Sequence, residues 1–329
     1  MSRDHVGRIV IERTGGPEVL SWQEGELPAL GPNDVRVRHT AIGVNFIDVY
    51  FRQGVYPASG FPLPLGKEAA GVVEAVGGAV TEFRAGDRVA YGFAPLGAYS
   101  EARVISADEL VHVPNGIDDR VAAAIMLKGM TAEYLLHRTY AVRPGDVILV
   151  HAAAGGVGLL LCQWAKHLGA RVIGTVGSER KAQLAARHGC DETILYTKED
   201  VAQRVRELTH GAGVRVVYDS VGKDTFDGSL SSLAKRGMLV LFGQSSGKVP
   251  PLDLQVLNAK GSLFVTRPSL GHYVGTRPEL VESARRLFDA VSAGTLRVEI
   301  GATYPLREAA RAHVELEARR TTGSTVLLP

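Results

Sequence analysis

The sequence predicts an α/β protein in which a doubly wound parallel sheet is joined to a mostly antiparallel β domain. Three patterns lead to this fold class. Short strands punctuated by Gly and Pro fill residues 1–125, strands and helices alternate over 126–266, and a small-residue turn at 152–158 links one strand to one helix. Alternating strands and helices favour a parallel sheet with helices on both faces, whereas consecutive short strands favour antiparallel pairing.

The first 125 residues are expected to form a curled β domain. Gly- and Pro-rich turn signals occur at 15–17, 31–34 and 86–87. The expected strands lie at 7–12, 34–41, 69–76, 87–91 and 99–105. No helical alternation separates them, so antiparallel pairing is the prediction for this segment.

The middle of the chain is expected to carry the parallel sheet and the tail to return to the first domain. A helix near Met130 to Tyr140 precedes strands at 147–151, 171–176, 193–195, 214–218, 238–242 and 262–266. The tail contains an amphipathic helix at 277–293, an extended piece at 298–301, a helix around 306–319 and a strand at 324–328. Because this tail is too short for a domain of its own, we expect it to pack on the first β segment. One domain is then 1–125 with 267–329, and the other is 126–266.

The turn at 152–158 reads AAAGGVG and indicates a nucleotide site. An apolar run, Val147 to Val150, precedes it, and a helical pattern follows. A turn without large side chains can approach a pyrophosphate closely, and the unpaired N–H groups at the start of the helix attract negative charge. Ala153 stands where the usual G-x-G-x-x-G pattern has its first glycine, and a lone glycine-rich turn is often only a tight connection. The alternating strands around it favour a dinucleotide site.

The end of the next strand indicates which dinucleotide binds. Enzymes that use NAD usually place Asp or Glu there to bind the ribose 2′-OH. Here the strand ends TVGS at 175–178, and Glu179 is followed at once by Arg180 and Lys181. The missing acid removes repulsion toward a 2′-phosphate and the cations attract it, which favours NADPH over NADH. The alternative interpretation is that both cations only solvate the first turn of a helix.

Composition excludes several classes of protein. Lys plus Arg total 37 against 35 Asp plus Glu in 329 residues. This balance provides neither a basic field for nucleic acid nor a polybasic membrane anchor. Cys162 and Cys190 are the two cysteines and do not form a C-x-x-C pair, so a disulfide framework or a Cys-rich metal site is not expected. Since no apolar targeting core and no long apolar run occurs, we expect a soluble, cytoplasmic protein.

Many strings in the chain resemble one family over its full length. The signature positions of that family are here Gly145, Asp146, Leu149, Ala153, Ala154, Gly155, Gly156, Gly158, Gln163 and Lys166. Further family-like strings are GGPEVL at 15–20, NFIDVY at 45–50, LGAYSEA at 96–102, LKGMTA at 127–132, VYDSVG at 217–222 and VTRPSL at 265–270. The chain thus resembles the zeta-crystallin-type quinone oxidoreductases of the medium-chain dehydrogenase/reductase superfamily. The resemblance implies a GroES-like catalytic β domain, a Rossmann domain that binds NADPH, and a quinone substrate.

The positions at which zinc-dependent relatives bind metal are altered. Asn45 replaces their first Cys, Gly66-Lys67-Glu68 replaces their Gly-His-Glu, and the cysteines of their structural-zinc lobe are missing. Catalytic zinc needs three protein ligands and structural zinc needs four, so we expect a protein without a metal. Without a Lewis acid the acceptor must itself be electrophilic, which favours a quinone or another activated carbonyl compound.

The resemblance also implies which residues meet the cofactor. Those expected at the nicotinamide end are Asn45, Phe46, Ile47, Asp48 and Tyr50, with Lys128, Thr131 and Tyr134 on the helix that enters the nucleotide domain. Those expected at the phosphates and the adenosine are Gly155, Gly156, Val157, Gly158, Gly177, Ser178, Lys181 and Tyr196. Those expected along the carboxyl edge of the sheet and the nicotinamide are Ser220, Phe242, Gly243, Gln244, Ser245, Phe264, Val265 and Arg267, with Arg319 reaching a phosphate from the tail. Lys128 and Arg319 are also open to a simpler interpretation as solvated cations.

Three of these side chains are candidates for catalysis. Asn45 can donate an amide hydrogen bond, and Tyr50 and Tyr56 can line an aromatic quinone pocket or donate a proton. Plain packing of the two tyrosines is the alternative. Asp48 is expected to be an ionised structural acceptor with an ordinary pKa.

The sequence also leads to an expectation for assembly and leaves two alternative functions open. The strand at 262–266 has the composition of an edge that pairs with its twin in a homodimer, as the resemblance implies, or that the tail covers. One rival function is NADPH-dependent reduction of an alkenal or enone double bond. The other is a non-catalytic NADPH-binding sensor or an RNA-binding protein.

Overall fold

The computed structural model describes residues 5–58 and 60–329, and it confirms the predicted fold class. The chain divides into two compact units. Unit 1 comprises Met1–Lys128, Gly275–Phe288 and Val298–Pro329, and unit 2 comprises Gly129–Val274 and Asp289–Arg297. Each unit has its own sheets and its own core, so each is described by itself.

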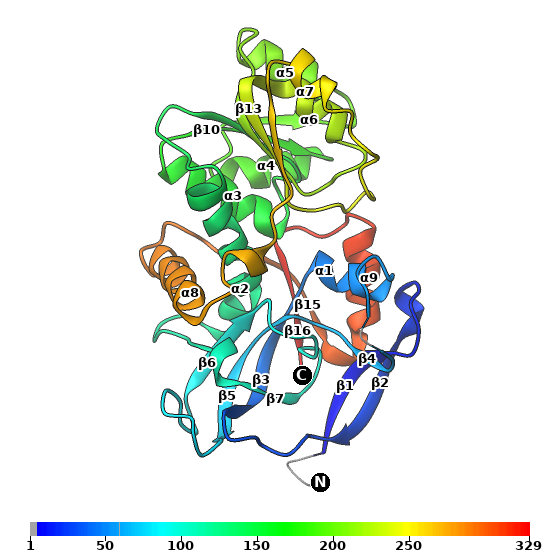
Figure 1. Ribbon diagram of the computed structural model, residues 1–329, viewed down its shortest axis with the longest axis vertical. Helices are drawn as coiled ribbons and strands as arrows, with labels where there is room; N and C mark the ends of the chain where they lie inside the picture. Colours follow the sequence, from blue (N-terminus) through cyan, green and yellow to red (C-terminus); the bar gives the residue numbers. More distant parts are fainter. Residues whose placement is uncertain (1–4, 59) are drawn as a thin grey trace. The chain divides into compact units, whose positions relative to one another are not determined.

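Unit 1 is built from two β sheets (Figure 1). The smaller sheet has the strand order β2-β1-β4, and the larger has the order β15-β16-β3-β5-β6-β8, with β7 also paired to β3. The strands are β1 (His5–Ile11), β2 (Leu20–Glu26), β3 (Asp34–Val44), β4 (Leu63–Pro64), β5 (Glu68–Val76), β6 (Arg88–Gly92), β7 (Ala102–Ser106), β8 (Val111–His112), β15 (Ile300–Pro305) and β16 (Ser324–Leu328). The helices are α1 (Phe46–Arg52), most of α2 (Asp119–Tyr134), most of α8 (Arg277–Ser292) and α9 (Ala309–Glu317), with 3₁₀ turns at Pro17–Val19, Ala107–Glu109 and Leu306–Glu308.

The tail of the chain completes the larger sheet of unit 1. β16 pairs antiparallel with β3, where Thr325 lies opposite Val44, and it pairs in parallel with β15. The end of the tail thus packs on the first β segment, whereas Asp289–Arg297 of the same predicted tail belong to unit 2. The core beneath these strands includes Val35, Val37 and Leu327, all fully buried.

Unit 2 is a parallel sheet of six strands in the order β11-β10-β9-β12-β13-β14. Its elements are β9 (Val147–Val150), α3 (Gly156–His167), β10 (Arg171–Val176), α4 (Glu179–Arg187), β11 (Glu192–Leu195), α5 (Val201–Leu208), β12 (Val214–Asp219), α6 (Phe226–Ser232), β13 (Leu233–Leu241), α7 (Gln255–Ala259) and β14 (Phe264–Thr266), with a 3₁₀ turn at Leu270–His272. The strand order reverses at β9, whose neighbours are β10 and β12. In such a sheet, ligands bind at the carboxyl ends of the strands beside this switch point.

Side chains on one face of this sheet form a continuous core with α5 and α6. Leu149 lies beside Ile173 and Val217 in register, and Phe226 and Leu230 of α6 pack in the same cluster. The residues that alternate with them, including Ile148 and Val172, are also fully buried, so both faces of the sheet are covered. This burial fixes the strands whose ends carry the candidate site.

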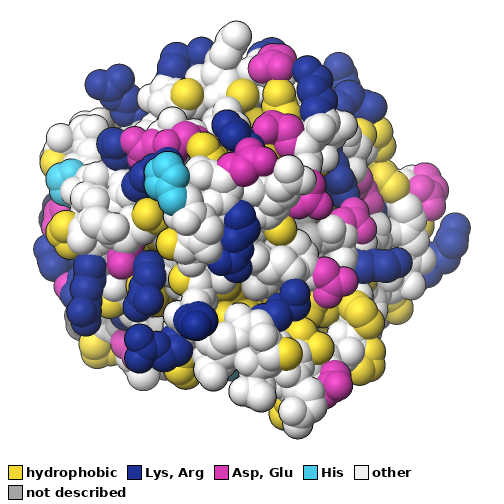
Figure 2. Space-filling view, turned by 90° about the horizontal axis from the view of Figure 1, so that it is seen from above, with side chains coloured by type: hydrophobic (Ala, Val, Ile, Leu, Met, Phe, Trp, Pro, Cys, Tyr) yellow, Lys and Arg dark blue, Asp and Glu magenta, His cyan; other side chains and the backbone are white. Residues whose placement is uncertain are grey.

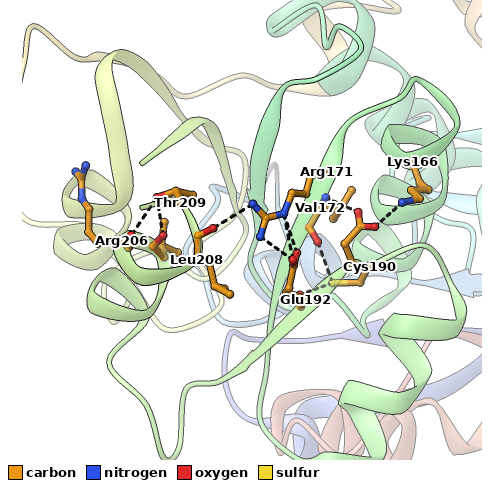
Figure 3. A network of polar contacts seen from close by, with 10 residues as sticks. Lys166, Arg171, Val172, Cys190, Glu192, Arg206, Leu208 and Thr209 are labelled. Atoms are coloured by element: carbon orange, nitrogen blue, oxygen red, sulfur yellow. Dashed lines mark hydrogen bonds and ion pairs between the residues drawn. The ribbon is translucent and has the colours of Figure 1, made fainter. Parts of the chain in front are cut away.

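Polar contacts fasten the β10–β11 side of the sheet (Figure 3). Arg171 donates to Glu192 at 2.7 Å and to the carbonyl oxygen of Leu208 at 3.0 Å, which joins β10 to β11 and to α5. The buried Cys190 thiol donates to the carbonyl oxygen of Glu192 at 2.9 Å. Cys162 is fully buried on α3, as its place on the apolar face predicts.

Several elements differ from the sequence prediction. Helix α2 begins at Asp119 rather than near Met130, because an acidic first turn and a run of alanines at 122–124 favour the helix earlier. Its continuation, Leu135–Thr139, is a π-helix. Strand β2 and helix α1 were not predicted at all. The α1 segment is rich in β-branched and aromatic residues, which favour strands. The cap at its N-terminal end stabilises a helix instead.

The surface shows no large field of one sign on the face seen in Figure 2, where acidic, basic and apolar side chains are intermixed. Within the described residues, no helix has both the length and the apolar character that a membrane crossing requires.

Candidate active site

Helix α1 places five of the predicted site residues at its N-terminal end. Asn45 is the residue that caps the helix, and Phe46, Ile47, Asp48 and Tyr50 follow within its first turns. The backbone N–H of Asn45 donates to Asp48 Oδ2 at 2.9 Å, which closes the capping box. The cap turns the chain sharply from β3 into the helix and holds both side chains at that corner.

Asn45 belongs to a buried polar cluster with Glu68 and Lys128. Asn45 Nδ2 donates to Glu68 Oε2 at 2.7 Å, and Lys128 Nζ lies 3.1 Å from the same oxygen. The N–H of Leu127 donates to the other carboxylate oxygen at 2.7 Å. Gly43 leaves the room that the carboxylate needs, since a Cβ there would lie 2.2 Å from Glu68 Oε2. The sequence prediction missed Glu68, whose only signal was its place after Lys67 in the altered metal motif.

This cluster does not fit a zinc ion. The Lys128 ammonium already balances the Glu68 carboxylate, has no lone pair for a metal and repels a second cation. Within the described residues, no group of three or more His, Cys, Asp or Glu is placed to hold a metal. A buried ammonium thus lies beside Asn45, on the same carboxylate oxygen of Glu68.

A second buried chain of hydrogen bonds ends on Asp48. Arg52 Nη1 donates to His313 Nδ1 at 3.0 Å, so the ring proton lies on Nε2 and is donated to the Tyr99 hydroxyl at 3.0 Å. Tyr99 in turn donates to Asp48 Oδ2 at 3.0 Å. Arg52 is held by Glu317 at 2.7 Å, which ties α1 to α9, its neighbour in Figure 1. Burial lowers the pKa of His313 to about 3, so its ring is neutral at ordinary pH.

The expectation of an ordinary pKa for Asp48 is wrong. Its side chain is fully buried, and burial raises the pKa from 3.8 to about 7. The hydrogen bonds from Asn45 and Tyr99 oppose this shift, as does the positive charge of Lys128, while Glu68 adds to it. Oδ1 has no hydrogen-bond partner among the described residues, which leaves part of the carboxylate without compensation for lost solvation.

The two candidate tyrosines lie in an aromatic cluster on and after α1. The ring centroids of Phe46 and Tyr50 are 5.5 Å apart, those of Tyr50 and Tyr56 are 5.4 Å apart, and those of Phe51 and Tyr56 are 5.6 Å apart. These are ordinary distances for tilted and edge-to-face pairs. Asn45, Tyr50 and Tyr56 thus lie on one short stretch of unit 1, with the rings in mutual contact.

In unit 2, the small-residue turn begins helix α3 at the carboxyl end of β9. Gly155 caps the helix, and Gly156, Val157 and Gly158 form its first turn, where N–H groups lack intrahelical partners. A Cβ on Gly158 would lie 2.3 Å from the carbonyl oxygen of Ala152, so this glycine permits the close crossing of turn and helix. The turn therefore has the backbone geometry that a pyrophosphate needs.

A buried polar network supports that turn from below. Ser229 donates its hydroxyl proton to Asp219 Oδ2 at 2.7 Å, so its oxygen accepts from His151 Nε2 at 3.0 Å. The other ring nitrogen, His151 Nδ1, then accepts from the Thr175 hydroxyl at 2.9 Å. Burial lowers the pKa of His151. Because His151 directly follows β9 and the other side chains come from β10, β12 and α6, the network ties together the strand ends that surround the turn.

The residues predicted for the 2′-phosphate lie together beyond β10. Ser178 caps α4, where its Oγ accepts from the N–H of Lys181 at 3.4 Å. Tyr196 follows β11, and its hydroxyl would be 2.6 Å from a Cβ on Gly177. Glu179 pairs with Lys198 at 3.2 Å. The strand end itself carries no carboxylate.

The loops after β12 and β13 also meet at the carboxyl edge of the sheet. Ser245 N–H donates to the carbonyl oxygen of Ser220 at 3.1 Å, and a Cβ on Gly243 would lie 2.5 Å from the same oxygen. Phe242 and Gln244 lie in the same loop. Arg267 Nη1 donates to the carbonyl oxygen of Leu241 at 3.1 Å, which places this cation at the same edge.

The remaining predicted residues lie elsewhere in their units. Thr131 and Tyr134 are buried near the end of α2, and Tyr134 stacks on Tyr273 with ring centroids 4.2 Å apart. Phe264 and Val265 lie on the edge strand β14 and are 57% and 36% exposed. Arg319 is exposed in unit 1, just after α9.

Comparison with known families matches both halves of the chain. Residues 31–144 match the family described as alcohol dehydrogenase GroES-like domain, and residues 156–289 match the family described as zinc-binding dehydrogenase.

Similar proteins cover nearly the whole chain. The quinone oxidoreductase of Pseudomonas aeruginosa is 58% identical over 322 residues, which is 98% of this chain and 99% of that protein. The 2-haloacrylate reductase of a Burkholderia species is 51% identical and covers 97% of this chain and 98% of that protein. Among solved structures, Escherichia coli quinone oxidoreductase complexed with NADPH has a TM-score of 0.96 at 49% identity, covering 98% of this chain and 100% of the other.

Proposed function

The chain belongs to the quinone oxidoreductase family of the medium-chain dehydrogenase/reductase superfamily, and from this premise we propose that it reduces a quinone with NADPH and without zinc. NADPH supplies the hydride. The observation that carries the proposal is the Asn45–Glu68–Lys128 cluster, which puts an ammonium and an amide beside an aromatic cluster. A quinone is electrophilic enough to accept hydride without a Lewis acid, so the protein needs only to orient it, exclude water and donate hydrogen bonds.

The residues of unit 2 are proposed to hold the nucleotide. The first turn of α3, with Gly155, Gly156, Val157 and Gly158, would bind the pyrophosphate through backbone N–H groups. Gly177, Ser178, Lys181 and Tyr196 would bind the 2′-phosphate. The loop at 242–245 and Arg267 would line the nicotinamide side of unit 2. Asn45, the α1 residues and Lys128 are proposed as the cofactor-binding residues of unit 1.

A steady-state assay tests the activity. NADPH oxidation is followed with 1,4-benzoquinone as acceptor, in parallel with NADH and after treatment with a chelator. We expect turnover with NADPH that the chelator leaves unchanged and that NADH supports poorly. An enzyme that loses activity with the chelator, or that shows no activity with benzoquinone, contradicts the proposal.

Lys181→Ala tests the proposed cofactor preference. Loss of a charge-assisted contact to phosphate costs about 1.5–3 kcal/mol, so we expect the KM for NADPH to rise roughly 10- to 100-fold and the KM for NADH to stay nearly constant. Lys198→Ala is the matched control, because its ammonium pairs with Glu179. Equal effects of Lys181→Ala on both cofactors would remove the 2′-phosphate role.

A second candidate activity is reduction of an activated carbon–carbon double bond. It is favoured by the similarity to a 2-haloacrylate reductase at 51% identity. The cofactor geometry is the same, and the hydride goes to a β-carbon instead of a quinone ring. Turnover of an enal compared with that of benzoquinone decides which acceptor is preferred.

The assembly is proposed to be a homodimer through β14. Its edge carries no further strand within the described residues, and Phe264 is 57% exposed on it. Open strand edges of this kind favour pairing with a second copy. We expect light scattering to give twice the chain mass and Phe264→Lys to shift it toward the monomer. A parent protein that is monomeric at micromolar concentration contradicts this.

A small molecule, rather than nucleic acid or a membrane, is the proposed main partner, in line with the near-neutral charge balance. The cytoplasmic location stays a prediction from composition.

A further inference from the structure

Lys67 is a buried ammonium that forms no ion pair with a carboxylate of the described residues, although the charges of Asp48 and Glu109 act on it from a longer distance. The residue is 8% exposed, and its Nζ donates to the carbonyl oxygen of Ala94 at 2.8 Å. It forms no ion pair within the described part of the chain, whereas the other buried lysine of unit 1, Lys128, pairs with Glu68. An ammonium has three donors, so two N–H groups of Lys67 remain available to a ligand.

Aromatic rings surround this ammonium. Nζ lies 4.6 Å from the centroid of the Phe93 ring and 5.7 Å from that of Phe51. Both distances are within cation–π range, which compensates only a small part of the lost solvation. Burial accordingly lowers the pKa of Lys67. Phe93 also has a left-handed backbone, with φ at +71°, a conformation that is costly for a bulky residue.

The rings around Lys67 are continuous with the proposed acceptor residues. Phe51 contacts Tyr56 at 5.6 Å between centroids, and Tyr56 contacts Tyr50 at 5.4 Å. A path of ring contacts therefore runs from the catalytic candidates to the ammonium. All of these residues belong to unit 1.

Buried charges in proteins are normally paired, because an isolated charge loses its solvation without compensation. A ligand that suits both features of this cluster has a flat, electron-poor part for the rings and an anionic oxygen for the ammonium. A carboxylate conjugated to an acceptor meets both requirements.

We propose that the Lys67 ammonium binds the carboxylate of a planar acceptor, so that the preferred substrates are quinones or conjugated alkenes that carry a carboxylate. This inference rests on the proposed function. The hydride from NADPH adds to the electrophilic carbon, the π electrons move to the adjacent carbonyl or α-carbon, and a proton from water completes the reduced acid. The carboxylate takes no part in bond changes and serves to anchor the acceptor.

The test compares two quinones that differ by the anionic group, 1,4-naphthoquinone and 1,4-naphthoquinone-2-carboxylate. For the parent protein and Lys67→Gln, the ratio of kcat/KM values for the two quinones is measured. We expect Lys67→Gln to lower kcat/KM for the carboxylate roughly 10- to 100-fold, as for loss of a charged hydrogen bond, and to change the neutral quinone less than about threefold. Lys67→Arg keeps the charge and should retain most of the preference.

Arg84→Gln is the matched control, because it removes one positive charge from a side chain that is 88% exposed in unit 1. Equal losses with both quinones in Lys67→Gln would mean that Lys67 only supports the Phe93–Ala94 turn, and this would overturn the inference. No loss with either quinone would overturn it as well.

Binding gives a readout that is independent of turnover. Calorimetric titration of the protein, in the presence of NADP⁺, with 1,4-naphthoquinone-2-carboxylate should show a Kd at least about tenfold weaker for Lys67→Gln than for the parent. Lys67→Met, whose apolar side chain suits the ring environment, replaces Lys67→Gln if the latter does not fold. If the carboxylate binds more weakly to Lys67→Gln but neither quinone is turned over, the proposed function is refuted and only the carboxylate-binding role of Lys67 stands. Turnover with unchanged binding in the variant would refute the inference alone.

Discussion

Asp48→Asn is expected to stabilise unit 1 most above about pH 7 and to have little effect below about pH 4. The side chain of Asp48 is fully buried at the start of α1, and its pKa is about 7 against 3.8 in the unfolded chain. The folded protein therefore holds a proton that the unfolded chain releases. Asparagine resembles the protonated acid in shape and charge, and it does not titrate.

The sign and size of the effect follow from proton linkage. Below pH 3.8 the carboxyl is protonated in both states, so no free energy of folding is lost. Between pH 3.8 and 7 the unfolded state ionises first, and stability falls by about 1.36 kcal/mol per pH unit. Above pH 7 the loss is constant at roughly 4 kcal/mol, an upper bound because the site relaxes around the charge. An amide in place of Asp48 removes this loss.

Urea unfolding at pH 5, 6, 7 and 8 measures the effect. The chain has two tryptophans, Trp22 in unit 1 and Trp164 in unit 2, so a Trp164→Phe background makes fluorescence report unit 1 alone. We expect Asp48→Asn to exceed its parent by at most about 1.6 kcal/mol at pH 5 and by at most about 4 kcal/mol at pH 8. Asp118→Asn, at an exposed carboxyl, is the control and should show no trend.

A difference that stays the same from pH 5 to pH 8 would refute the reasoning, because it would mean that Asp48 is ionised over the whole range. A difference that grows toward acidic pH would refute it as well. That result would indicate a carboxylate stabilised by Asn45 and Tyr99 more than it is destabilised by burial.

Two further substitutions test other parts of the structure. Gly158→Ala should lower stability by about 1–3 kcal/mol and weaken NADPH binding in a fluorescence titration, because the added Cβ lies 2.3 Å from the carbonyl oxygen of Ala152. Gly228→Ala on α6 is the control, because its added Cβ would lie in open space, and it should raise the melting temperature. A similar loss of stability in both variants would contradict the packing argument. Arg52→Met should lower the free energy of unfolding by about 3–5 kcal/mol, since it leaves Glu317 without its ion-pair partner at 2.7 Å, and a change under about 1 kcal/mol in urea unfolding would show that this ion pair contributes little.

Local patterns in the sequence were sufficient to predict the parallel sheet and its nucleotide turn. Runs of β-branched residues predicted the strands of unit 2, and the small residues at 152–158 correctly predicted the start of α3. Helix α1 could not be predicted in this way, because its composition favours a strand and only the reciprocal capping by Asn45 and Asp48 decides otherwise. Boundaries such as the start of α2 at Asp119 depend on weak preferences spread over several residues.

The polar networks of the site could not be predicted from the sequence for a different reason. Glu68 meets Lys128 across 60 residues, and Tyr99 meets His313 across 214. No local pattern records such contacts, which exist only after the sheets have formed. The same holds for the raised pKa of Asp48, since burial is a property of the packed protein and not of the side chain. The sequence also could not predict that Lys67 forms no ion pair within the described residues, because its neighbours come from distant parts of the chain.

The place of β16 in the larger sheet has a consequence for how the protein is made. The strand pairs with β3, yet it leaves the ribosome long after it, whereas every strand of unit 2 is already synthesised by Thr266. At about 5–20 residues per second, the nascent chain waits for roughly 14–56 s before the end of β3 at Ile42–Val44 has its partner strand. Unit 2 can fold during that interval, whereas the larger sheet of unit 1 closes only after β16 has been synthesised.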